Sequence, residues 1–176
     1  MSHKGNIIVI KKPYNDDMVI PNLISYVAES DYADDDFYAG GTRLTPDGVY
    51  CTEYQEVIED FLDVQATVDL KNNRRAFQMI VSIVECKNMY GIINYIAQKS
   101  VEYFISMGYQ CFAVPHYGSK KNMMNYHVHL IVNPISYVSG QGRLYDKSAL
   151  YYNFMNYLSM STHLNLQVIF KKAYDD

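Results

Sequence analysis

Tyr126-His127-Val128-His129-Leu130-Ile131-Val132-Asn133-Pro134 is a run of β-forming residues that carries two histidines two positions apart. Apolar residues alternate along it with the period of a β-strand, so both imidazoles leave the same face of a sheet, with Asn133 further along that face. A histidine on a strand is usually a packing residue, and a pair with this spacing also arises by chance. The run therefore predicts a strand, and its chemistry depends on what lies beside it.

A third histidine, His116, ends the preceding apolar run 109–115, and a polar loop, 118–125, separates the two runs. If the runs form an antiparallel hairpin, His116 lies across from the start of the second strand and beside His127. Three neutral imidazoles that converge form a common site for Zn, Mn, Ni or Co, with positions left open for water or substrate. Spacing alone is compatible with any metallohydrolase.

The composition is that of one globular domain. The chain has 176 residues, of which 49% are hydrophobic and 19% charged. This length predicts a single domain over residues 1–176, because it is sufficient for one hydrophobic core and too short for two. Its three cysteines lie in apolar surroundings, which is typical of reduced thiols in a cytoplasmic protein. No apolar stretch is long enough to predict a membrane span.

The charge of the chain bears on nucleic-acid binding. A formal net charge of −4 argues against non-specific binding to nucleic acid. Local basic clusters weaken that argument, and the 18 tyrosines offer faces on which bases can stack. We therefore expect clustered side chains, rather than net charge, to hold DNA; the candidates are Lys12, Arg74, Arg75, Lys120, Lys121 and Arg143.

Periodicity and turn residues predict an α+β fold. The predicted strands lie at 6–10, 76–84, 109–115, 126–134 and 166–170, and 48–51 is a candidate for another short one. The predicted helices begin at Pro21-Asn22, with Asn22 as N-cap, and cover 52–70, 90–107 (closed by Gly108) and 146–163, while 30–41 is expected to be a loop. This order predicts a central, mostly antiparallel sheet of about five strands that carries its helices on one side.

Tyr26 follows the first predicted strand in the otherwise apolar segment Leu23-Ile24-Ser25-Tyr26-Val27. One tyrosine on a short helix is ordinarily a packing residue. The order of elements from Ile7 to Phe170, however, resembles that of the relaxase/mobilisation nuclease family, in the HUH endonuclease superfamily. Members of that family nick DNA during the transfer of plasmids and conjugative elements.

Three motifs carry the resemblance. A lysine-bearing strand followed by L-V-x-Y-I is similar to Lys11-Lys12 and 23–27, which implies that Tyr26 is the nucleophile. The motif Y-H-F-V-Q-S-F is similar to 77–83, which implies that Ser82 contacts DNA. The motif H-x-D followed by H-x-H-x-x-x-N, and then T-G-K-K, is similar to His116, 127–133 and 139–143; it implies His116, His127 and His129 as metal ligands and Asn133 as a DNA-binding residue.

The chain departs from the third motif in two ways. The acid after the first histidine is absent, since Tyr117-Gly118 follows His116, and the gap from His116 to His127 is longer than in the family. In the family, that acid helps to activate the tyrosine or to hold a metal-binding histidine. The departure bears on how efficiently the chain nicks DNA.

The resemblance implies a site- and strand-specific endonuclease that acts on single-stranded or hairpin DNA at a transfer origin. Tyr26 would form a 5′-phosphotyrosyl intermediate and release a 3′-hydroxyl, assisted by Mn²⁺, Mg²⁺ or Zn²⁺. The resemblance further implies a bacterial, mobile-element-encoded protein with accessory mobilisation proteins as partners. Relaxases commonly carry C-terminal extensions, so the chain is also compatible with the N-terminal part of a longer protein.

Three alternatives stay open at the level of sequence. One is a degenerate relative that binds single-stranded or hairpin DNA without nicking it. A second is a rolling-circle replication initiator or a transposase of the HUH superfamily, although the tyrosine of such proteins usually follows the histidines. The third is an unrelated three-histidine metallohydrolase in which water is the nucleophile.

Overall fold

The computed structural model describes residues 3–41, 53–71, 73–84, 90–121, 125–140 and 142–172. Its strands form one six-stranded sheet in the order β2-β4-β5-β3-β1-β6. Every neighbouring pair is antiparallel except β1 and β6. The strands are β1 (Lys4–Ile10), β2 (Tyr38–Gly40), β3 (Phe77–Ile83), β4 (Tyr109–Tyr117), β5 (Tyr126–Ser136) and β6 (Asn165–Lys171). The predicted α+β fold with a mostly antiparallel sheet is confirmed, and the candidate strand at 48–51 lies outside the described residues.

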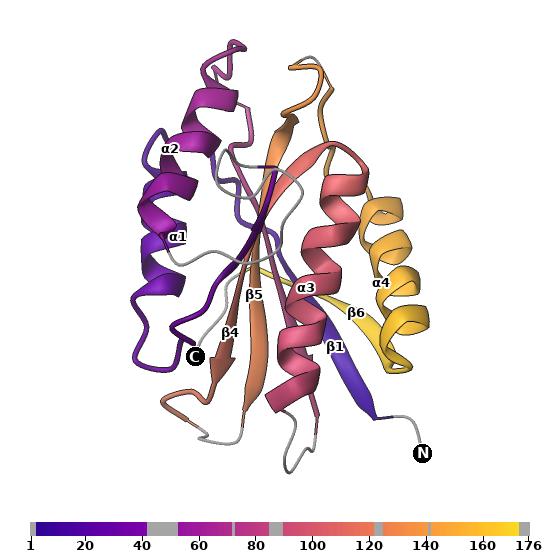
Figure 1. Ribbon diagram of the computed structural model, residues 1–176. Helices are drawn as coiled ribbons and strands as arrows, with labels where there is room; N and C mark the ends of the chain where they lie inside the picture. The colour runs from indigo at the N-terminus through magenta and orange to yellow at the C-terminus, as the bar shows by residue number, and fades with distance from the viewer. Residues whose placement is uncertain are drawn as a thin grey trace.

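The helices cover both faces of the sheet, so the prediction that they lie on one side is wrong (Figure 1). Alternate residues of the central strands are apolar in both sets. Val128, Leu130 and Val132 pack in one cluster with α3 and α4, while Ile131 packs in a second cluster with α1 and α2. Each set of apolar side chains is removed from water only if helices pack on its own face of the sheet. The helices are α1 (Val19–Ala28), α2 (Tyr54–Gln65), α3 (Tyr90–Ser106) and α4 (Ser148–Thr162).

Strand β2 lies inside the segment for which the sequence predicts a loop. Its Tyr38 pairs with Ala113 and its Gly40 with Cys111 at the edge of β4. A Cβ atom on Gly40 would lie 2.4 Å from the Cγ2 atom of Ile105, so only glycine lets α3 approach this strand. A strand of three residues that ends in glycine is too short to show the alternation of polar and apolar residues by which strands are predicted.

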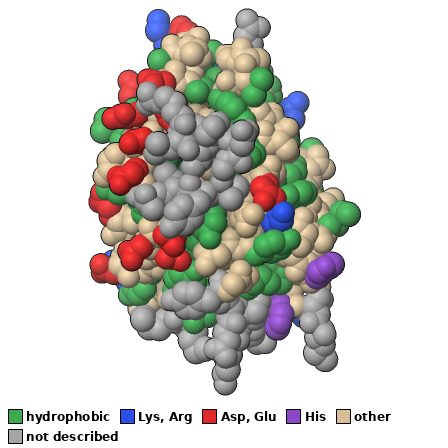
Figure 2. All heavy atoms as spheres, in the orientation of Figure 1, with side chains coloured by type: hydrophobic (Ala, Val, Ile, Leu, Met, Phe, Trp, Pro, Cys, Tyr) green, Lys and Arg blue, Asp and Glu red, His purple; other side chains and the backbone are tan. Residues whose placement is uncertain are grey.

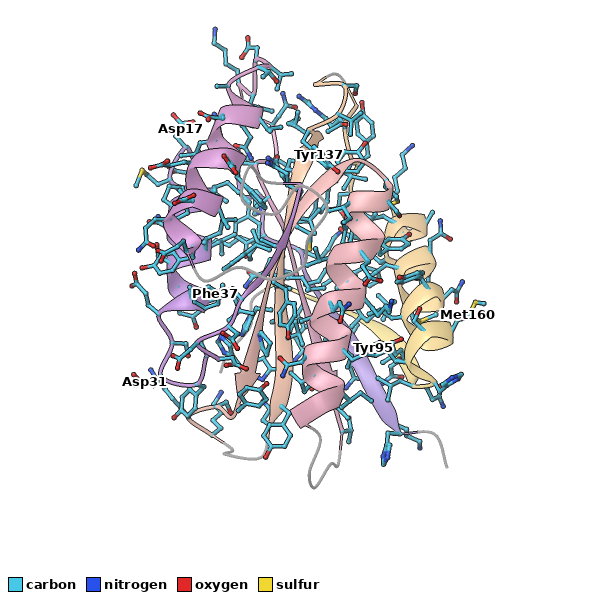
Figure 3. All side chains as sticks on the ribbon, viewed as in Figure 1. Asp17, Asp31, Phe37, Tyr95, Tyr137 and Met160 are labelled. Atoms are coloured by element: carbon cyan, nitrogen blue, oxygen red, sulfur yellow. The ribbon has the colours of Figure 1, made fainter. Side chains whose placement is uncertain are left out.

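Helix α1 begins at Val19, earlier than the sequence predicts. Pro21 lies in its first turn, where the missing N–H costs nothing. The amide of Asn22 donates to the Met18 carbonyl, so Asn22 is inside the helix and its assignment as N-cap is wrong. Asp17 and Asp31 flank α1 and lie at the upper left and lower left of Figure 3. The helix therefore runs along the sheet toward the turn between β4 and β5.

The β4–β5 hairpin is the part of the fold that positions the histidines. His116 pairs directly with His127, and Val114 pairs with His129. Gly108, at φ 84°, precedes β4 and closes α3 as predicted. We call the end of the sheet where β4 stops and β5 starts the histidine end, and the opposite end the far end.

Candidate metal centre

His116, His127 and His129 converge on the sheet face that α1 and α2 cover. Their ring centroids are 5.1 Å apart for His116 and His127, 4.4 Å for His116 and His129, and 4.8 Å for His127 and His129. The exposed fraction of each residue is 2% or less. The predicted hairpin register thus brings all three imidazoles together in a buried cluster.

Backbone contacts determine which nitrogen of His116 and of His127 carries the proton. The Nδ1 atom of His127 donates to the Asn125 carbonyl at 3.0 Å, so the lone pair of the neutral ring is on Nε2. That Nε2 lies 3.0 Å from the Nε2 of His129. The Nε2 of His116 donates to the Val27 carbonyl at 2.8 Å, which leaves the lone pair of the neutral His116 ring on Nδ1.

The cluster fits a divalent transition-metal ion. One ligand atom from each histidine lies within 4.8 Å of the others. Two imidazole nitrogens bonded to one ion at about 2.1 Å are about 3.0 to 3.4 Å apart, depending on the coordination geometry. The measured 3.0 Å between His127 and His129 is in that range. Burial, together with the charges of His116 and His127, holds the pKa of His129 well below its usual range, so the ring is neutral and able to act as a ligand.

Tyr26 is on the last turn of α1, next to the residue that contacts His116. Val27 is fully buried and turned toward the sheet, whereas Tyr26 is 57% exposed. Ile24 and Val27, on the buried side of the helix, fix the turn in place. The structure therefore brings the backbone beside Tyr26 into contact with the histidine cluster, while the phenol ring lies on the accessible side of α1.

A row of polar side chains continues from the histidines across the sheet. Ser82 pairs with His127, Asn6 pairs with Ser82, and Gln167 pairs with Asn6. Gln167 donates to the Asn6 side-chain oxygen at 2.7 Å. Ser82 and Asn6 are half-buried and Gln167 is exposed, whereas the neighbouring Ile8 and Ile80 are buried. Polar groups that solvent reaches thus lead from the centre to the edge strand β6.

The predicted DNA-binding residues divide between the two ends of the molecule. Ser82, Lys120 and Lys121 lie at the histidine end, and both lysines are exposed in the β4–β5 turn. Register places the others at the far end, because Phe77 and Ile10 begin and end their strands there. These far-end residues are Lys12, Arg74, Arg75, Asn133 and Arg143.

Two far-end arginines are engaged by acids. Arg74 pairs with Asp146 at 3.3 Å and lies over the Phe77 ring. Arg75 forms an ion pair with Asp17. Their charges are partly neutralised within the protein, so they are poorer candidates for phosphate contacts than Lys120 and Lys121.

Asn133 is fully buried, and its side chain forms hydrogen bonds with neighbouring residues of the fold. Its amide nitrogen donates to the Phe61 carbonyl at 3.1 Å and to the Gln110 side chain at 2.8 Å. Its oxygen accepts from Gln65 at 3.2 Å and from the amide of Ile135 at 3.2 Å. These bonds connect α2 to the hairpin and leave DNA no access, so we do not retain Asn133 as a DNA contact.

An acidic segment lies beside His116 and turns its Asp34 carboxylate away from the histidines. Ala33 forms a bridge with His116, and the amide of Asp34 donates to the Pro115 carbonyl at 2.9 Å. The Asp34 carboxylate accepts from the Tyr117 hydroxyl at 2.9 Å. Tyr117 packs against the cluster under α3, so this carboxylate is directed toward the sheet face opposite to the imidazoles.

Sequence reasoning missed the groups that hold the imidazoles. The carbonyls of Val27 and Asn125 are backbone atoms, and no residue type marks them. Asn6 and Gln167 are polar residues in strands, and only the register shows that they share a row with Ser82. Asn6 is followed by the unbroken apolar run 7–10, so no alternation in β1 marks its face.

None of the helices in the described ranges is both long and apolar enough to cross a membrane.

Comparison with known proteins identifies the family. No curated protein and no solved structure matches the chain significantly. Residues 32–161 match the family described as "Relaxase: MobA/VirD2-like, nuclease domain". The match includes the three histidines and Ser82, and it begins after Tyr26. With its HUH-like sheet and buried histidine trio, the chain belongs to the MobA/VirD2-like relaxase nuclease family, a family of DNA-nicking endonucleases.

Proposed function

We propose that this protein is a site- and strand-specific endonuclease that nicks single-stranded DNA at a transfer origin, with Tyr26 as nucleophile. The observation that carries the proposal is the contact between the histidine cluster and the last turn of α1, at 2.8 Å between His116 and Val27. It brings the helix that bears an exposed tyrosine onto three convergent imidazoles. A nucleophile and a phosphate-activating centre are the two parts that transesterification needs.

The reaction conserves the number of phosphodiester bonds. The Tyr26 oxygen attacks phosphorus, a phosphotyrosyl bond forms, and the bond from phosphorus to the 3′ oxygen breaks. The phenol proton goes to a base, and the leaving 3′ oxygen takes up a proton to become a hydroxyl. Because an ester replaces an ester, the reverse reaction can religate the strand without ATP.

His116, His127 and His129 would hold a Mn²⁺, Mg²⁺ or Zn²⁺ ion. Such an ion supplies Lewis-acid activation of the phosphate. The three imidazoles converge, and backbone carbonyls fix the orientation of His116 and His127. A phenol has a pKa of about 10, so Tyr26 also needs an elevated pH or a neighbouring base to react.

Tyr14, Tyr32 and Tyr38 are the rivals of Tyr26 for the role of nucleophile, and Tyr14 and Tyr38 are poorer candidates than Tyr26. Tyr14 is buried and bonded to Gln78, and burial raises the pKa of Tyr14 to about 12. Burial, followed by the charges of Asp34 and Asp36, raises the pKa of Tyr38. Tyr26, by contrast, is exposed on a helix that is anchored to the core.

The DNA strand in this proposal follows the histidine end. Lys120 and Lys121 supply positive charge there, and Ser82 with Asn6 supplies hydrogen-bonding groups along the sheet. Acidic side chains gather over α1 and α2 on the left of Figure 2 and would repel the backbone. We propose single-stranded or hairpin DNA as the substrate and accessory mobilisation proteins as further partners.

A DNA-binding protein that does not nick is the second candidate. The absent acid after His116 favours it. A rolling-circle initiator is less well supported, because Tyr26 precedes the histidines in the chain. A three-histidine hydrolase with water as nucleophile would need no tyrosine.

The test is a denaturing gel of the protein with labelled single-stranded DNA that carries a transfer-origin sequence, with Mn²⁺ or Mg²⁺. A covalent protein–DNA band supports the proposal. Retarded but intact DNA in a native gel, without that band, supports the non-nicking protein. Cleaved DNA without a covalent band supports the hydrolase, and each of these two results contradicts the proposal.

A further inference from the structure

The last turn of a helix leaves carbonyl groups without helical partners. In α1, one of these carbonyls accepts a hydrogen bond from a side chain on the sheet. The Ser25 carbonyl accepts from the amide of Glu29 at 2.9 Å, which completes the helix. The Val27 carbonyl, two residues further along, accepts instead from the Nε2 of His116 at 2.8 Å. Both Val27 and His116 are buried, so solvent does not compete for this bond. The end of α1 is therefore joined to a histidine of the candidate metal centre.

The direction of this bond suits a metal ligand. A histidine that binds a metal through one nitrogen ordinarily donates its other N–H to a carboxylate or a backbone carbonyl, which orients the ring. The bond to Val27 keeps the proton of His116 on Nε2 and the lone pair on Nδ1. The carbonyl end of a helix also carries partial negative charge, equivalent to about half an elementary charge. The end of α1 thus offers His116 the acceptor and the negative potential of an acid.

We propose that the Val27 carbonyl replaces the acid that is absent after His116 and couples metal binding to the turn that carries Tyr26. The inference rests on the metal-assisted function proposed above. A bound cation makes the N–H of His116 more acidic and strengthens its bond to Val27. The last turn of α1 is then held more firmly against the sheet, and Tyr26 with it. By linkage, a looser α1 end weakens metal binding by the same factor.

Hydrogen exchange tests the coupling without DNA. Zn²⁺ is added to the protein, and the change in exchange of the backbone amides in the last turn of α1 (26–29) is compared with that of Asn22 in its first turn, since Pro21 has no amide proton. The amides of the last turn are expected to slow about fivefold, near the low end of known couplings between sites, and that of Asn22 to stay unchanged. No change in the last turn when Zn²⁺ binds, or the same change in both turns, would overturn the inference.

Two glycine substitutions, one at each end of α1, test the reverse direction. Ala28→Gly weakens the last turn beside Val27, and Asn22→Gly weakens the first turn; neither side chain belongs to the proposed centre. Calorimetry should show an affinity for Zn²⁺ that is lower by about fivefold in Ala28→Gly and the same as wild type in Asn22→Gly. A merely structural bond would lower the unfolding free energy of Ala28→Gly and leave its affinity intact, which would contradict the coupling.

The outcomes separate this inference from the proposed function. Slower exchange of the last turn with no covalent adduct on DNA supports the coupling and contradicts Tyr26 as nucleophile. A covalent adduct on Tyr26 with no change in exchange supports the nicking function and overturns the coupling. Failure to bind Zn²⁺ at all overturns both the coupling and the metal-assisted mechanism.

Discussion

His129 is the residue on which the candidate centre most depends. It is fully buried, and its Nε2 lies 3.0 Å from that of His127. His129→Ala should abolish stoichiometric Mn²⁺ or Zn²⁺ binding in calorimetry, because two imidazoles hold an ion far less tightly than three. The circular dichroism spectrum should remain native-like, and His3→Ala, outside the cluster, should bind as wild type does. Undiminished binding by His129→Ala would contradict the assignment.

Asn133 provides the opposite case, a motif residue whose structural environment suggests packing. Its amide has hydrogen bonds to Phe61 and Gln110 and is closed to solvent. Asn133→Ala should lower the unfolding free energy by about 1 to 3 kcal/mol, since buried partners lose their bonds. Affinity for single-stranded DNA, measured well below the melting temperature, should stay within about twofold. A large loss of affinity in a stably folded variant would restore Asn133 as a DNA contact.

The sequence allowed the convergence of the three histidines to be predicted, but not the groups that hold them. Strand alternation and the position of His116 were enough to bring the three imidazoles together. The Val27 carbonyl reaches His116 from 89 residues away in the chain, and it does so through backbone rather than side chain. Contacts of that kind follow from tertiary packing alone.

At the scale of elements, the hairpin was predictable because two long apolar runs flank a polar loop. Strand β2 and the second layer of helices were not predicted. Three residues ending in Gly40 have no periodicity. The central strands are apolar without clean alternation, which is typical of burial on both faces, but the prediction placed helices on one face only. The early start of α1 was hidden by Pro21, which is tolerated in a first turn.

Asp146 connects β1, the segment before β3 and the start of α4. Burial raises the pKa of its carboxyl, but hydrogen bonds from Lys11 and Tyr151 and the charges of Lys11 and Arg74 outweigh burial and lower it overall. Because the pKa of Asp146 is lower in the folded than in the unfolded protein, its ionised carboxylate stabilises the fold at every pH above the unfolded-state pKa of about 3.9. This stabilisation is lost as the pH falls through the folded-state pKa.

Asp146→Asn should therefore be less stable than wild type at pH 7 and should lose less of its stability on acidification below about pH 4. Urea unfolding at a series of pH values measures both effects. Parallel pH profiles for the two proteins would show that Asp146 contributes nothing to acid unfolding.

At the scale of the molecule, charge is unevenly distributed: the net charge is −4, but lysines cluster at the histidine end. Lys120 and Lys121 are exposed at the histidine end, while Lys171 and Lys172 are exposed at the far end of β6. Reversing Lys120 and Lys121 to glutamate should weaken single-strand binding. It should also flatten the dependence of log affinity on log salt by about 0.7 for each phosphate group that the protein no longer neutralises.

The same reversal of Lys171 and Lys172 is the matched control, because it changes the net charge equally. It should leave the salt slope close to that of wild type. If both reversals flatten the slope to the same extent, net charge rather than the histidine end governs binding. If neither does, the strand runs elsewhere.

The identity of the nucleophile is the central claim, and mass spectrometry of the trapped covalent adduct tests it most directly. Wild-type protein is incubated with single-stranded DNA and Mn²⁺ and digested, and the peptide that carries the nucleotide is sequenced. The modification should be on Tyr26. Tyr26→Phe, which removes only the hydroxyl, should form no adduct while binding metal and DNA normally, and Tyr32→Phe should react as wild type does. The rate should rise with pH as phenolate forms. A nucleotide on Tyr14, Tyr32 or Tyr38, or an adduct that persists in Tyr26→Phe, would contradict the account.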